Sequence, residues 1–284
     1  MTERKLVTLA DGLRFPESPR WRDGRLWFSD MFARRVMVVD IDGHTDVVAQ
    51  LDDEPSGLGF LADGTPLVVL MNRRQLVWLD SHGKPHVFAD LSHVAGSFLN
   101  DMVVTSDGRA YVDSIVDNGA VGTDKIILVE PDGRDRVAAD SERFELMERP
   151  NGLIITPDQK TLIFATTAKQ RLAAMNIDAD GSLSSPCVFA DTPGAAPDGI
   201  CLDAEGAVWA GGLESNQFLR LERGGRALES ISVNDRLAVA CVLGGPDRRT
   251  LFLLSAIGQR GHLREASAGF IDMATVEVPG AGWP

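Results

Sequence analysis

The chain has 284 residues, of which 44% are hydrophobic and 24% are charged, a composition typical of soluble globular proteins rather than disordered or membrane proteins. Its 28 basic and 41 acidic residues give a formal net charge of −13, and such a field repels nucleic acid. No apolar stretch approaches the ~18 residues that a membrane helix needs, and the N-terminal segment lacks the apolar core of a secretory signal. We therefore expect a cytoplasmic protein with neither membrane nor nucleic-acid partners.

The first predicted element is a short strand at residues 5–9 (KLVTL), which precedes the first copy of an internal repeat. In each copy an acidic residue, usually followed by Gly, opens a short apolar strand. The six acids are Asp23, Asp63, Asp107, Asp158, Glu205 and Asp247. They are 40 to 51 residues apart, which suits one four-stranded unit per repeat.

Further strand-length apolar runs follow each acid, bounded by Asp-Gly or His-Gly turns. Such runs occupy residues 35–41 and 45–51 in the first unit, 75–80 and 86–91 in the second, and 125–130 and 135–140 in the third. The pattern predicts an all-β fold, a six-bladed β-propeller of four-stranded antiparallel blades, which forms a single domain over residues 1–284. We expect residues 5–9 to complete the blade formed mainly by residues 238–279.

Three cysteines, Cys187, Cys201 and Cys241, are widely spaced and flanked by apolar residues. An odd number at such spacing fits neither a disulfide framework nor a zinc site built from paired cysteines. We interpret all three as buried small hydrophobic residues.

The repeat register indicates a shared site, because the first strand of every propeller blade faces the central channel. Counting back seven residues from the turn acid, or six in the shorter first unit, gives one position per blade. These positions are Glu17, Ser56, Asn100, Asn151, Asp198 and Ala240. Four of them carry strong oxygen donors at the start of an apolar strand.

Buried carboxylates need compensation, and a hard divalent cation supplies it directly. Taken singly, Asn151-Gly152 and Asp198-Gly199 are common turn dipeptides, Glu17 is a solvated charge, and Asn100-Asp101 fits an Asx turn. Their common register favours one axial cation instead. Ca²⁺ best matches these oxygen ligands, although Zn²⁺, Mn²⁺ or Fe²⁺ could occupy the same site.

The second strand of each blade ends on the same face as the first strand begins. This places Asp113 and Thr166 at the ends of the second strands of blades three and four, within reach of the axis. The nucleophile elbow, the zinc-protease motif and the phosphate-binding loop are all missing from the sequence.

Several segments resemble the blade signatures of the gluconolactonase, senescence marker protein and luciferin-regenerating enzyme family. They are FPESPRW, LNDMVV, PNGLIITPD, PDGICLDAEGAVWAG and ACVLGGPDRRTLF, and together they cover nearly the whole chain. The resemblance implies a six-bladed propeller that holds a catalytic divalent cation and hydrolyses lactones. It also implies that Glu17, Asn151 and Asp198 bind the metal. Asn100 would contact the substrate or a metal-bound water, and Asp198 would also act as general base.

Two departures from the family pattern affect the expected substrate. Sugar-lactone members have Arg where this chain has Phe98, and usually an acid where it has Thr166. Both changes predict a less polar pocket, in which Phe98, Asn100, Asp113 and Thr166 bind a small, relatively apolar or aromatic lactone or ester. The alternatives are hydrolysis of an organophosphate, isomerisation or cyclisation of a carbonyl compound at the same metal, and a non-catalytic ligand-binding propeller whose metal is structural.

Overall fold

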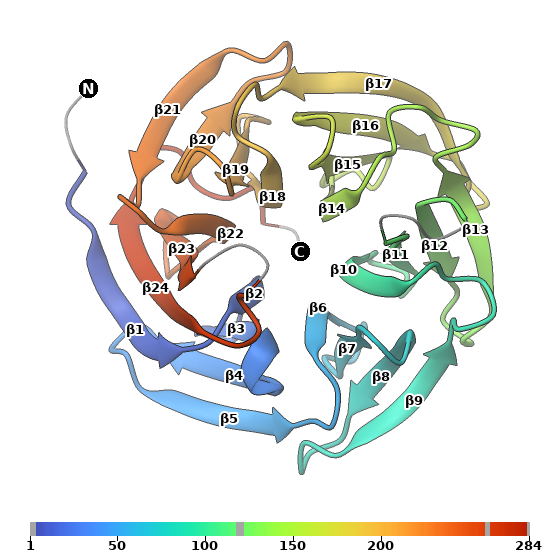
Figure 1. The fold of residues 1–284 in the computed structure, drawn as a ribbon, viewed down its shortest axis with the longest axis horizontal. Coiled ribbons are helices and arrows are strands. Elements are labelled where there is room, and N and C mark those ends of the chain that lie inside the picture. Colours follow the sequence, from blue (N-terminus) through green and yellow to red (C-terminus); the bar gives the residue numbers. More distant parts are fainter. Residues whose placement is uncertain (1–3, 118–121, 259–261, 283–284) are drawn as a thin grey trace.

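The computed structural model describes residues 4–117, 122–258 and 262–282. Within these ranges the chain forms six four-stranded antiparallel sheets, one 3₁₀ turn, η1 (Met31–Ala33), and no α-helix. Figure 1 looks down the axis of the ring that the sheets make. The predicted six-bladed β-propeller is therefore confirmed. In this part of the chain, no helix has the length and apolar character needed to cross a membrane.

Five blades are continuous in sequence and run from an inner strand to an outer one. Blades one and two contain β2 (Pro16–Arg22), β3 (Arg25–Asp30), β4 (Arg35–Asp40), β5 (Thr45–Gln50), β6 (Pro55–Phe60), β7 (Pro66–Leu70), β8 (Gln75–Leu79) and β9 (Pro85–Asp90). Blade three contains β10 (Phe98–Val104), β11 (Ala110–Ile115), β12 (Lys125–Val129) and β13 (Asp135–Asp140). Blades four and five contain β14 (Pro150–Ile155), β15 (Thr161–Thr166), β16 (Arg171–Ile177), β17 (Leu183–Asp191), β18 (Pro197–Leu202), β19 (Val208–Gly212), β20 (Gln217–Leu221) and β21 (Ala227–Ser232).

The sixth blade joins the two ends of the chain and so closes the ring. It contains β22 (Leu237–Gly244), β23 (Thr250–Gly258), β24 (Ser267–Thr275) and, as its outer strand, β1 (Val7–Leu13). In this pairing Val7 faces Met273 and Leu13 faces Gly269. The expected closure by an N-terminal strand is confirmed, although the strand starts at Val7 and extends to Leu13.

The hydrophobic core lies between adjacent blades. Large aromatic side chains on the second strands of five blades are completely buried there: Phe28, Tyr111, Phe164, Trp209 and Phe252. One continuous cluster, for example, combines residues of blades two and three. A single blade cannot bury both of its faces, so each depends on its neighbours for stability.

The three cysteines do not share one environment. Cys201 and Cys241 are buried on inner strands, as expected, but Cys187 is exposed. The expectation for Cys187 was wrong because it lies on β17, the outer strand of blade four, where an apolar sequence context does not ensure cover.

Candidate active site at the propeller axis

Six inner strands surround the axis, and each contacts the next around the ring. They are β2, β6, β10, β14, β18 and β22. The register positions selected from the sequence all lie on these strands: Glu17, Ser56, Asn100, Asn151, Asp198 and Ala240. Figure 1 shows the inner strands converging on the centre of the molecule.

A bulge marks the same position in every blade. The pairing of the first strand with the second shifts register between Glu17 and Arg20 in blade one, and between Asn151 and Leu153 in blade four. Equivalent shifts occur in the other four blades. Ser18, directly after Glu17, has a φ of 47°. Bulges re-aim side chains, and here they interrupt the ladder at the axial positions.

The axial positions differ in burial from their neighbours. Glu17, Asn100 and Asn151 are half-buried, although the residues on either side of each are buried. Asp198 is only 3% exposed. Solvent and small molecules therefore reach these three polar side chains, whereas the Asp198 carboxylate is buried.

Hydrogen bonds connect polar side chains of three blades. Ser56 Oγ donates to Asn100 Oδ1 at 3.2 Å, and Asn100 Nδ2 donates to Asn151 Oδ1 at 3.1 Å. The Gly152 amide donates to the same Asn151 oxygen at 2.8 Å. These hydrogen bonds fix the Asn100 amide between Ser56 and Asn151.

The carboxylates at the axis interact through their charge. Burial raises the pKa of Glu17 well above its ordinary value, and the charges of Asp198, Asp101 and Asp113 raise it further. The Ser18 amide opposes the rise by donating to Glu17 Oε2 at 3.2 Å. Negative charge is thus concentrated on the axis.

Gly152, directly after Asn151, lies where β14 and β18 approach closely. Its φ is +22°, and a Cβ added to it would lie 2.2 Å from the Asp198 carbonyl oxygen. The Asn151-Gly152 pair belongs to β14 and is therefore not a turn. Glycine is needed here because a side chain would collide with the backbone of β18.

Sequence reasoning missed a buried carboxylate beside Asn100. Asp101 accepts hydrogen bonds from Ser18 Oγ at 3.0 Å and from the Leu153 amide at 3.0 Å, and it lies 3.7 Å from a guanidinium nitrogen of Arg20. It thereby links blades one, three and four. The available signal was the acid that directly follows Asn100 in the segment LNDMVV.

The three remaining predicted residues lie at different depths. Phe98 begins β10, is half-buried like Asn100, and packs against the hydrophobic cluster around Phe15 and Met71. Asp113 and Thr166 are completely buried. Asp113 accepts the Asp101 amide at 2.6 Å and has a long contact of 3.5 Å with Asn100 Nδ2. Direct contact of Asp113 or Thr166 with substrate stays a prediction. Their complete burial favours a role in positioning the residues that line the site.

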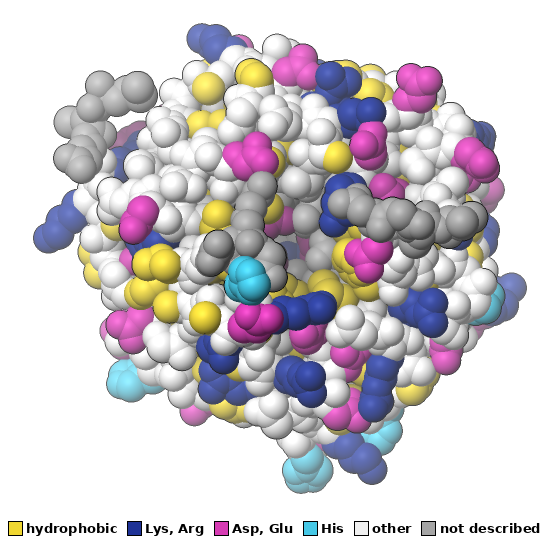
Figure 2. Space-filling model, in the orientation of Figure 1, with side chains coloured by type: hydrophobic (Ala, Val, Ile, Leu, Met, Phe, Trp, Pro, Cys, Tyr) yellow, Lys and Arg dark blue, Asp and Glu magenta, His cyan; other side chains and the backbone are white. Residues whose placement is uncertain are grey.

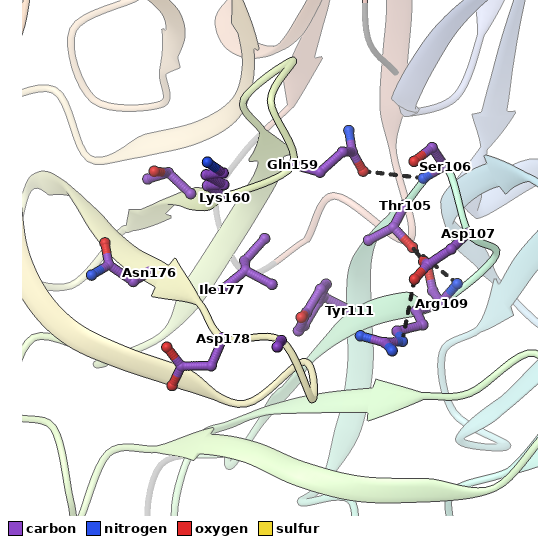
Figure 3. Close-up of a pocket in the computed structure, with 12 residues that line it drawn as sticks. Thr105, Ser106, Asp107, Arg109, Tyr111, Gln159, Lys160, Asn176, Ile177 and Asp178 are labelled. Atoms are coloured by element: carbon purple, nitrogen blue, oxygen red, sulfur yellow. Dashed lines mark hydrogen bonds and ion pairs between the residues drawn. The ribbon is translucent and has the colours of Figure 1, made fainter.

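A cavity of about 640 Å³ opens elsewhere, between blades three and four (Figure 3). Its lining includes Thr105, Arg109 and Gln159 from the turns that follow the inner strands. Asn100 and Asn151 begin those strands, so this cavity is at the opposite end of the blades. Arg109 is paired there with Asp107 and Glu130, at 3.5 and 3.3 Å.

An exposed acidic cluster also lies away from the axis, in the turn between β4 and β5. Asp40, Asp42 and His44 are close enough together to share an ion. However, Asp40 Oδ1 already accepts the amides of Asp42 and His44, at 3.0 and 2.9 Å. The position of these side chains is thus explained by hydrogen bonds that close the turn.

Charged side chains of both signs are interspersed over the face seen in Figure 2. This distribution gives the face no single-sign field. The buried carboxylates of the axis are a separate, local feature.

Comparisons with known proteins agree with this architecture. The chain is 26% identical over 278 residues to 6-deoxy-6-sulfogluconolactonase of Pseudomonas putida, covering 94% of this chain and 93% of that one. It is 24% identical over 186 residues to the pentonolactonase XacC of Haloferax volcanii, covering 64% and 60%. The structure of a calcium-binding regucalcin from Agrobacterium tumefaciens superposes with a TM-score of 0.83 at 22% identity, covering 99% and 97%. Residues 15–257 match the model of the SMP-30/gluconolactonase/LRE-like region, and the chain belongs to this family.

Proposed function

We propose that the chain is a hydrolase that opens a lactone at the axial site, with a bound divalent cation. The observation that carries the proposal is the common bulged register of Glu17, Asn100, Asn151 and Asp198 on four inner strands. The relatives named for lactone hydrolysis support the reaction class.

The donor set fits a hard cation. Glu17 and Asp198 supply two carboxylates and Asn151 an amide oxygen, which are ligands that Ca²⁺ prefers. The pKa of Glu17 is raised first by burial and then by the charges of Asp198 and Asp101. A cation held by these three residues would compensate that charge. Zn²⁺, Mn²⁺ and Fe²⁺ remain possible occupants of the same oxygen ligands.

When bound, the cation would supply Lewis acidity that polarises the lactone carbonyl and favours the developing oxyanion. Asp198 then serves as general base. Its carboxylate accepts the proton of a water molecule as the water oxygen attacks the carbonyl carbon. Asn100 orients the substrate or the water, because Ser56 and Asn151 hold its amide in one position.

Phe98 favours an apolar or aromatic substrate over a sugar lactone. It lies two residues before Asn100 at the start of β10, and both side chains are half-buried in an otherwise buried strand. A phenyl ring offers no hydrogen bond to substrate hydroxyls. Desolvating hydroxyls beside it would cost roughly 1–3 kcal/mol each.

Elemental analysis of the purified protein, combined with a panel of aliphatic, aromatic and sugar lactones, tests the proposal. We expect about one bound divalent cation per chain, hydrolysis of the less polar lactones, and loss of turnover after chelation. Product masses distinguish hydrolysis, which adds water, from isomerisation. Turnover of organophosphates alone, or a lower melting temperature on chelation with no turnover of any compound, would refute the lactonase assignment.

A further inference from the structure

Two thiols lie in contact on neighbouring inner strands. Cys201 on β18 and Cys241 on β22 have their Sγ atoms 3.7 Å apart, and the residues are 7% and 2% exposed. Both are free. Cys201 lies three residues beyond Asp198 along β18, toward the end of the channel away from the axial site.

A small cavity lies beside this pair. It has a volume of about 30 Å³ and is lined by Cys201, Cys241, Arg20 and, from the C-terminal segment, Gly280 and Ala281. A volume of ~10–15 Å³ holds one water molecule. The cavity therefore has room for a molecule the size of hydrogen peroxide beside the two cysteines.

The surroundings of the two thiols differ. Cys201 is the more exposed of the two, and Arg20, whose Nε has no hydrogen-bond partner among the described residues, lines the same cavity. Cys241 donates to the Trp209 carbonyl at 3.6 Å, and burial raises the pKa of its thiol. Cys201 is thus the thiol that a peroxide reaches first, and Cys241 is the one that resolves.

We propose that Cys201 and Cys241 form a redox-active dithiol that a hydroperoxide oxidises reversibly to a disulfide between blades five and six. This modification site is separate from the proposed lactonase chemistry. It needs no metal and no substrate.

The oxidation proceeds in two balanced steps. The Cys201 sulfur attacks the terminal peroxide oxygen, the O–O bond breaks, and the products are a Cys201 sulfenic acid and an alcohol, or water from hydrogen peroxide. The Cys241 sulfur then attacks the Cys201 sulfur. The S–S bond forms, the S–O bond breaks, and the hydroxyl leaves with the Cys241 proton as water. The two thiols supply the two electrons that reduce the peroxide.

The strands are close enough for the cross-link. A disulfide requires the sulfur atoms to approach to about 2.05 Å. A Cβ added at Gly199, two residues before Cys201, would lie 2.4 Å from the Ala240 Cβ, so the two backbones already touch at this level. Side-chain rotation and a small strand shift supply the remaining approach.

Mass spectrometry of the full-length protein tests the proposal. Cys187→Ser first removes the exposed thiol as a source of intermolecular disulfides. The reduced protein is treated with equimolar hydrogen peroxide, then denatured and alkylated. We expect a mass loss of about 2 Da, no alkylation of Cys201 or Cys241, and one cross-linked peptide pair. Dithiothreitol should restore both thiols.

Two further variants in the same background assign the roles. Cys241→Ser should leave a Cys201 sulfenic acid that dimedone traps, and Cys201→Ser should leave Cys241 reduced. The proposal is overturned if both thiols of the Cys187→Ser protein stay fully alkylatable after peroxide, or if Cys201 proceeds to sulfinic acid without a cross-link. Neither result depends on lactonase activity, so this proposal can fail while the proposed function stands.

Discussion

The axial site and the cavity between blades three and four differ most in how their charges are compensated. In the cavity, Arg109 pairs with Asp107 and Glu130, and the Asp107 side chain is 59% exposed. At the axis, Glu17 faces the charges of Asp198 and Asp101 in a buried setting that raises its pKa. The cavity is roomy, and Arg109 has two carboxylate partners there. The axial site instead gathers carboxylates, for which we propose a cation.

This comparison teaches that the volume of a hollow is a poor guide to chemistry. An exposed ion pair contributes only about 0–1 kcal/mol and needs no ligand. Gathering several carboxylates in a buried setting costs several kcal/mol, even where a cationic side chain such as Arg20 lies near one of them. Substitutions at the two places should therefore differ sharply in effect.

The largest difference is expected between Asp198→Asn and Asp107→Asn. Asp198→Asn keeps the size of the side chain but removes the proposed base and a ligand charge. It should lower kcat/KM for an apolar lactone by about 10²–10⁴-fold. Asp107→Asn removes the charge of an exposed pair but keeps an oxygen for the Thr105 hydroxyl, and it should change kcat/KM by less than about twofold. Steady-state hydrolysis with saturating Ca²⁺ measures both.

Circular dichroism and elemental analysis control for misfolding and metal loss in these two variants. If Asp198→Asn keeps the wild-type rate while folded and metal-loaded, Asp198 is not the base. An equal loss in Asp107→Asn would remove the distinction between the axis and the cavity.

A pair of glycine substitutions tests the close approach of β14 and β18. Gly152→Ala puts a Cβ 2.2 Å from the Asp198 carbonyl oxygen, and we expect it to lower the free energy of unfolding by roughly 2–4 kcal/mol. Gly206 also has a positive φ, +81°, but its added Cβ meets nothing within 4 Å. Gly206→Ala should therefore cost only about 1 kcal/mol.

Urea denaturation of the two glycine variants provides the measurement. Equal costs would mean that backbone strain, rather than contact between inner strands, fixes the glycine after Asn151. A larger cost for Gly152→Ala would mean that close packing of β14 against β18 fixes it.

The propeller, and the placement of the proposed ligands on its inner strands, were predictable from sequence because both follow from a repeat. The acid that opens each second strand is a local signal, and counting from it selects Glu17, Asn151 and Asp198 without any knowledge of long-range contacts. Closure by an N-terminal strand follows from the same count, since the last repeat lacks its outer strand.

The contacts that support the site were not predictable, because they join residues far apart in the chain. Asp101 holds Ser18 of blade one and the Leu153 amide of blade four, and no local pattern encodes that geometry. The exposure of Cys187 was likewise hidden, since inner and outer strands share an apolar composition and differ only in what covers them.

Phe98→Arg should change the choice of substrate rather than the fold. The guanidinium supplies donors for hydroxyl groups at a half-buried position two residues from Asn100. We expect the ratio of kcat/KM for a sugar lactone to that for an aromatic lactone to rise by about tenfold. Val87→Arg, on the exposed outer strand of blade two, controls for added charge. An unchanged ratio in Phe98→Arg would mean that Phe98 does not contact the substrate.

The last effect is expected in the pH dependence of stability set by Asp113. Burial, and then the charge of Asp101, raises the pKa of this carboxyl well above its ordinary value. Between the ordinary pKa near 4 and the raised one, the folded state holds a proton that the unfolded state has lost. The contribution of Asp113 to stability is therefore complete at low pH. It declines as the pH rises, by at most about 1.4 kcal/mol per pH unit.

Asp113→Asn should remove that decline, because the amide keeps an oxygen to accept the Asp101 amide at 2.6 Å but cannot ionise. Urea denaturation of both proteins between about pH 4.5 and 8 gives the difference in unfolding free energy at each pH, and titrating groups that do not interact with Asp113 cancel in it. As the pH rises, the unfolding free energy of Asp113→Asn should increase relative to that of the unchanged protein. Parallel curves would mean that Asp113 is ionised in the folded protein throughout. Negative charge would then extend behind Asn100, and the cation would have one more carboxylate to compensate.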